Sequence, residues 1–99
     1  RFKNRGTRME EYTYQEALKH LGGTQLKCYL TGISINILED DYQLDHILPI
    51  SKGGTNELSN MAIACVAANQ MKGGLTNEEL FSWCKKILEH NGYNVTKIE

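Results

Sequence analysis

The chain has 99 residues, a net charge of −1 and a hydrophobic fraction of 40%. This length allows one small domain with one modest core. There is no run of eighteen apolar residues and no signal-peptide pattern, which argues against a transmembrane helix and a membrane partner. The near-neutral charge does not by itself indicate a nucleic-acid binder, so the distribution of charge is more informative than its sum. We expect a single domain over residues 1–99.

Basic residues gather at the start of the chain, which contains Arg1, Lys3, Arg5 and Arg8. Residues 1–10 have no apolar periodicity, so a flexible, solvated arm is the simplest interpretation, and a phosphate-binding arm is the alternative. Because the first residue is not Met, we expect a piece of a longer chain, with an additional domain upstream of Arg1 or a homodimer.

The three cysteines, Cys28, Cys65 and Cys84, are odd in number and widely spaced. This is not a disulfide framework. It favours a reducing, cytoplasmic setting.

The first periodic segment covers residues 13–21 and predicts a helix. Thr13 followed by Glu16 is a capping box, in which each side chain accepts a hydrogen bond from a backbone N–H at the helix start. Further along, isoleucines alternate with polar residues over residues 33–37, which predicts a short, half-buried strand.

A longer helix is predicted over residues 77–90, where Thr76 and Glu79 form a second capping box. Its apolar stripe consists of Leu80, Phe81, Trp83, Cys84, Ile87 and Leu88. Such a stripe is typical of a core-facing helix, so we expect Trp83 and Cys84 to belong to the core and to have no direct function.

Between these helices lies the stretch that carries the chemistry, residues 42–74. Its pattern predicts a strand over 42–47, a glycine-containing loop over 51–56, a second strand over 60–64 and a short helix over 65–72.

The polar side chains of this stretch suit hydrolysis of a phosphodiester. A neutral imidazole, His46, is a suitable general base for water. Asp45 and Asn69 offer hard oxygen ligands for Mg²⁺ or Mn²⁺. Asn60 could bridge backbone groups and hold the loop after His46, and Lys72, one helical turn after Asn69, could place a charge on a phosphate.

Each of these residues also has an ordinary structural interpretation. Asp45 and His46 alone could be a capped turn or a satisfied polar pair. Asn60 and Asn69 alone could be a turn residue and a helix residue without a role.

The combination resembles the HNH endonuclease family. The residues that carry the resemblance are Asp45-His46, Gly53-Gly54, Asn60, Asn69 and Lys72-Gly73, and the segment Cys-Tyr-Leu-Thr-Gly at residues 28–32 extends it.

The resemblance implies an α+β fold, with a ββα-metal motif packed between N- and C-terminal helices. It implies His46 as the general base, Asn60 as the structural amide of the catalytic site, and one divalent cation held by Asp45 and Asn69. Because Asn69 stands where many relatives have His, the site is an HNN variant and favours Mg²⁺ or Mn²⁺ over zinc.

Many relatives also hold a structural zinc between two Cys-x-x-Cys pairs. Here the matching places read Cys28-Tyr-Leu-Thr31 and Cys65-Val-Ala-Ala68, so each pair lacks its second thiol. A four-thiolate site cannot form, and we expect no structural zinc. We expect Cys28 and Cys65 to be buried neighbours in apolar packing.

The function implied is metal-dependent hydrolysis of double-stranded DNA in a bacterial or phage-infected cell, leaving a 5′ phosphate, with Lys72 and Lys52 binding phosphate. The alternatives are a non-catalytic nucleic-acid-binding module on the same fold and a structural interaction domain.

Overall fold

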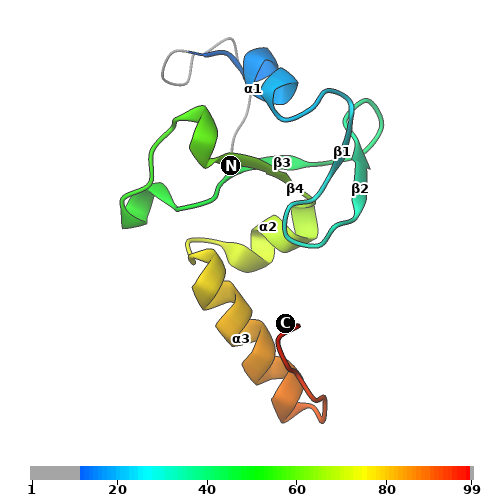
Figure 1. Ribbon diagram of the computed structural model, residues 1–99, viewed down its shortest axis with the longest axis vertical. Coiled ribbons are helices and arrows are strands. Elements are labelled where there is room, and N and C mark those ends of the chain that lie inside the picture. The colour runs from blue at the N-terminus through cyan, green and yellow to red at the C-terminus, as the bar shows by residue number, and fades with distance from the viewer. Residues whose placement is uncertain (1–11, 99) are drawn as a thin grey trace.

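The computed structural model describes residues 12–98. This part of the chain forms two two-stranded antiparallel sheets and three α-helices. In chain order they are α1 (Tyr14–His20), β1 (Gln25–Lys27), β2 (Ser34–Asn36), β3 (Gln43–His46), β4 (Met61–Ala64), α2 (Val66–Lys72) and α3 (Asn77–His90), with 3₁₀ turns at Ile50–Lys52 and Leu58–Asn60. The predicted α+β class is confirmed, since a ββα unit of β3, β4 and α2 is flanked by α1 and α3 (Figure 1). The predicted arm of residues 1–10 lies outside the described residues.

The hairpin of β3 and β4 positions the residues of interest. Leu44 pairs with Ile63 and Asp45 with Ala62 in antiparallel register. Successive side chains of a strand point to opposite faces. Leu44 therefore enters the core, where it is 2% exposed, whereas Asp45 faces α2.

The core joins this hairpin to α1 and to the smaller hairpin of β1 and β2. Its buried members are Tyr12, Ala17, Leu18, Cys28, Ile35, Leu44, Met61, Ile63, Ala64 and Ala68. The helix α1 begins at the predicted capping box. The predicted strand over residues 33–37 is shorter in the structure, Ser34–Asn36, with Ile35 buried in the core, Ile37 partly buried against it and Ile33 58% exposed.

The helix α3 also begins at its predicted capping box, but its apolar stripe is not in the core. Only Leu80 is buried, and Trp83 is 53% exposed. Figure 1 shows α3 running away from the rest of the domain after its first turns. The neighbouring helix α2 has seven residues, half the fourteen of α3. The prediction that Trp83 belongs to the core is therefore wrong. None of the described helices, α3 included, is long and apolar enough to cross a membrane.

We predict that Leu44→Ala lowers the free energy of unfolding by about 2–5 kcal/mol, because it removes a buried side chain and leaves a cavity between the hairpins. Leu38→Ala is the matched control, since Leu38 is 77% exposed and its truncation is expected to change stability by less than about 0.5 kcal/mol. Urea titration followed by circular dichroism measures both. Equal losses would contradict the core described above.

Candidate active site

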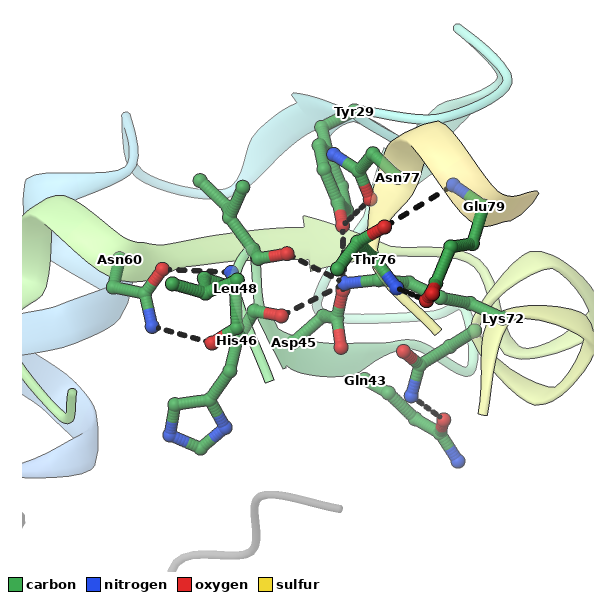
Figure 2. A network of polar contacts seen from close by, with 12 residues as sticks. Tyr29, Gln43, Asp45, His46, Leu48, Asn60, Lys72, Thr76, Asn77 and Glu79 are labelled. Atoms are coloured by element: carbon green, nitrogen blue, oxygen red, sulfur yellow. Dashed lines mark hydrogen bonds and ion pairs between the residues drawn. The ribbon is translucent and has the colours of Figure 1, made fainter. Parts of the chain in front are cut away.

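The candidate site lies where β3 ends, at Asp45 and His46. Because the two residues are consecutive on a strand, their side chains point to opposite sides of the backbone (Figure 2). The Asp45 side chain is only 12% exposed. A carboxylate with so little access to water requires compensation by hydrogen bonds or by an opposite charge.

Two donors, the buried Lys72 and the partly buried Tyr29, converge on one oxygen of Asp45. The Lys72 ammonium donates to Oδ2 over 2.6 Å, and the Tyr29 hydroxyl donates to the same atom over 2.5 Å. The other oxygen, Oδ1, takes part in neither bond. No buried polar side-chain atom in the described residues lacks a partner, so Oδ1 must reach solvent.

Lys72 is the charged centre of this network. The residue is 1% exposed, and its ammonium also donates to the carbonyls of His46 (2.8 Å) and Ile47 (3.0 Å) and to the Tyr29 hydroxyl (3.1 Å). These contacts join α2 to the end of β3. Lys72 was expected to bind phosphate, but an enclosed ammonium surrounded by four oxygens does not fit that role. The helical spacing from Asn69 indicated that Lys72 lies beside the site, but it did not indicate that Lys72 is buried.

Tyr29 extends the network to α3. Its hydroxyl is 3.2 Å from Oδ1 of Asn77, the first residue of that helix. Burial raises the pKa of Tyr29, and its hydrogen bond to Asp45 raises it further, because a phenolate beside a carboxylate is unfavourable. The hydroxyl therefore remains a donor to Asp45 at neutral pH.

Asn60 makes the bridging contacts expected of it. Its Oδ1 accepts from the backbone N–H of Leu48 (2.8 Å), and its Nδ2 donates to the carbonyls of Leu48 (3.0 Å) and Thr55 (2.8 Å). One side chain thus ties both ends of the loop that follows His46. An amide suits this position because it offers a donor and an acceptor at once.

Backbone geometry and close packing explain why this loop has glycine at positions 53 and 54. A Cβ on Gly54 would lie 1.8 Å from the Leu48 carbonyl oxygen, and Gly53 has a φ of +94°. Only glycine satisfies both demands without strain. The tight loop brings Asn56 to His46, where Asn56 Oδ1 is 2.6 Å from His46 Nε2. Asn56 therefore helps to fix the orientation of the imidazole.

Asn69 faces the same strand from α2. Its Nδ2 donates to the side-chain oxygen of Gln43, a buried residue two positions before Asp45. Residues i and i+2 lie on one face of a strand, and residues i and i+3 lie on one face of a helix. Asn69 and Lys72 therefore lie opposite Gln43 and Asp45. The two expected metal ligands are placed on elements that face each other.

Lys52 lies on the surface beside α3. Its ammonium forms an ion pair with Glu79 over 2.7 Å, with side chains 38% and 46% exposed. Hydrogen bonding to Lys52, followed by the backbone bond from Thr76, lowers the pKa of Glu79. Unlike Lys72, Lys52 is accessible from solvent.

Comparison with protein families gives a match to the HNH endonuclease model over residues 28–77, half of the chain. The chain belongs to the HNH endonuclease family. No curated protein and no solved structure gave a match. The matched range contains the ββα unit and the turn that carries Tyr29.

The cysteines of this HNH domain lie in the expected apolar packing, since Cys28 belongs to the core and Cys65 packs against it, and polar contacts join them as well. Cys28 is buried, but Cys65 is only partly buried, and Thr31 contacts both. The Thr31 N–H donates to Cys28 Sγ (3.4 Å), and Thr31 Oγ1 is 3.9 Å from Cys65 Sγ. Burial alone would raise the pKa of Cys28, but bonds from the Thr31 hydroxyl and from the backbone N–H groups of Cys65, Thr31 and Leu30 outweigh it and lower the pKa to about 7.

Four polar residues of the HNH site were not identified from sequence: Tyr29, Gln43, Asn56 and Asn77. Gln43 could have been found, since a polar residue two positions before Asp45 shares its face. Tertiary packing brings Tyr29 to Asp45 and Asn77 to Tyr29, so the spacing along the chain does not indicate either contact.

We predict that Lys72→Met lowers the free energy of unfolding by about 3–5 kcal/mol, because it leaves the Asp45 carboxylate buried without its partner. Lys52→Met, at the exposed ion pair, is the matched control and is expected to cost about 0–1 kcal/mol. Chemical denaturation of both variants is the measurement. Replacing both partners in Lys72→Met/Asp45→Leu should recover most of the loss. If it does not, the loss comes from packing of the lysine stem.

Proposed function

We propose that this HNH domain hydrolyses phosphodiester bonds of double-stranded DNA with the help of one divalent cation. The observation that carries the proposal is that His46 and Asp45, consecutive residues at the end of β3, are each held by separate contacts. The His46 ring is held through Asn56, and Asp45 through Lys72 and Tyr29. Fixed geometry of this kind is what a reacting phosphate requires.

His46 is the proposed general base. An imidazole accepts a proton from water near neutral pH and so generates the attacking nucleophile. Asn60 acts on this step indirectly: by holding the Leu48 backbone it fixes the chain just after His46. Asn60 is thus a positioning residue, as the family resemblance implies.

Asp45 and Asn69 are the proposed cation ligands. Their donor chemistry fits a hard ion, since Oδ1 of Asp45 reaches solvent and the Asn69 amide contributes a second oxygen. Within residues 12–98 no three His, Cys, Asp or Glu side chains lie close enough to hold a metal together, so the proposed ligand set needs the amide oxygen of Asn69 beside the Asp45 carboxylate. Mg²⁺ or Mn²⁺ would supply positive charge to the phosphate oxygens in the transition state.

Lys52 is the proposed phosphate contact, because its ammonium is accessible and its partner Glu79 is equally exposed. An exposed ion pair contributes little to stability, so it can be exchanged for a phosphate at small cost. Phosphate contacts of this type position the duplex and carry no sequence information.

We predict that His46→Ala slows plasmid nicking by about 10²- to 10⁴-fold, the usual contribution of a general base. His90→Ala is the matched control, since His90 lies exposed at the far end of α3. The assay compares supercoiled plasmid in Mg²⁺ with plasmid in EDTA, and circular dichroism confirms that both variants fold. Nicking by His46→Ala at the parental rate would exclude His46 as the base. Salt-dependent DNA binding without any nicking by the parent would favour the non-catalytic module.

We predict that Asn69→Ala raises the Mg²⁺ concentration needed for half-maximal nicking more than it weakens DNA binding, because it removes one oxygen ligand and no phosphate contact. Asn94→Ala, at an exposed position, controls for the loss of an amide. Nicking rates across a Mg²⁺ series, together with fluorescence anisotropy of a labelled duplex, separate the two effects. An unchanged Mg²⁺ dependence would remove Asn69 from the ligand set.

A further inference from the structure

Among the described residues, the candidate cation site offers a divalent ion one negative charge, and that charge is already compensated. Asp45 is its one carboxylate, and no cluster of three potential metal-binding side chains forms in the part of the chain that the structure describes. The Lys72 ammonium lies 2.6 Å from Asp45 (Figure 2). Tyr29, Gln43 and Asn69 add hydrogen-bonding groups without charge.

This compensation is permanent, because Lys72 cannot leave. Its side chain is fully enclosed, and its ammonium is held by two backbone carbonyls besides Asp45. Turning Asp45 so that Oδ2 faced a cation would leave that ammonium buried without its counter-charge, which is strongly unfavourable. Asp45 can therefore offer a cation only Oδ1.

We infer that the divalent ion and the nucleic-acid phosphate bind to this site cooperatively, with Lys72 setting the coupling. A carboxylate paired with a fixed ammonium attracts a cation weakly, and Mg²⁺ commonly completes its coordination with substrate phosphate. The phosphodiester supplies the net negative charge that the pair of Asp45 and Lys72 lacks. This inference rests on the proposed function, and it adds the coupling between the two ligands and the residue responsible for it.

Coupling of this kind is reciprocal. If the duplex tightens Mn²⁺ binding by some factor, Mn²⁺ must tighten duplex binding by the same factor. Couplings between two ligands typically amount to about 5- to 150-fold. The coupling factor measured from Mn²⁺ binding and the factor measured from duplex binding should therefore agree.

The experiment uses the His46→Ala protein, so that DNA is not consumed, with Mn²⁺ as the probe. Free Mn²⁺ is followed by electron paramagnetic resonance without and with a short mixed-sequence duplex, after subtraction of Mn²⁺ bound by the duplex alone. Fluorescence anisotropy measures duplex affinity in Mn²⁺ and in EDTA. We expect the duplex to raise the affinity for Mn²⁺, and Mn²⁺ to raise the affinity for the duplex, each by at least about fivefold.

The Lys72→Met substitution, added to the His46→Ala protein, tests whether Lys72 sets the coupling. Without the ammonium, Asp45 is uncompensated, so Mn²⁺ alone should bind more tightly than in the parent, and the gain on adding duplex should shrink. A lysine that only supported the fold would give the opposite result, a loss of Mn²⁺ affinity. Tyr29→Phe is the matched control, because it removes the other bond to Oδ2 and leaves the charge unchanged. It should not tighten Mn²⁺ binding.

Equal Mn²⁺ affinity with and without duplex would overturn the inference, as would weaker Mn²⁺ binding by Lys72→Met. If Lys72→Met does not fold, the comparison with and without duplex decides alone. Failure of the proposed function is a separate result, namely no plasmid nicking by the parent, and the Mn²⁺ titrations without DNA do not depend on it.

Discussion

The ion pair between Lys72 and Asp45 is the interaction on which the site depends. It crosses from α2 to β3 at a distance of 2.6 Å with the ammonium fully enclosed. Buried ion pairs seldom add much stability over an apolar pair, because removing two charges from water is costly. What this pair adds is position: the same ammonium holds the carbonyls of His46 and Ile47, so the strand end cannot move independently of the helix. The direction of Asp45 and the path of the chain after His46 are set together.

The two sides of this ion pair differ in how many contacts hold them in place. Asn60 closes the loop after His46 by three bonds to backbone, and Gly54 allows the chain to approach Leu48 closely enough for that closure. On the α3 side, by contrast, contact is limited to the first turns, where Leu80 is buried and Asn77 meets Tyr29. The beginning of α3 therefore contributes to the site, whereas the apolar stripe beyond it contributes nothing to the domain core.

Sequence patterns predicted the features whose cause is local. Both capping boxes and the period of β3 depend on residues a few positions apart, the bridging amide of Asn60 acts within one loop, twelve positions from Leu48, and each is present. The failures have causes that lie far along the chain. Lys72 was placed on the correct helical face, but its burial depends on Tyr29, 43 positions away. The strand β1 is three residues long and has no pattern of its own. The stripe of α3 follows helical periodicity, and periodicity cannot show whether a partner surface is present.

The turn that carries Tyr29 explains how the site is supported without the second thiol of each cysteine pair. Cys28 accepts hydrogen bonds from Thr31 and from the backbone of Cys65, which fastens the turn to the start of α2. The backbone N–H of Tyr29 donates to Ile63 of β4, so the turn is also joined to the central hairpin. The backbone of Tyr29 is thereby held in place independently of the hydrogen bond from its hydroxyl to Asp45. The Cys28 thiol and the Asp45 carboxylate are thus connected through Tyr29, and hydrogen bonds to the Cys28 sulfur help to fix the turn that carries it.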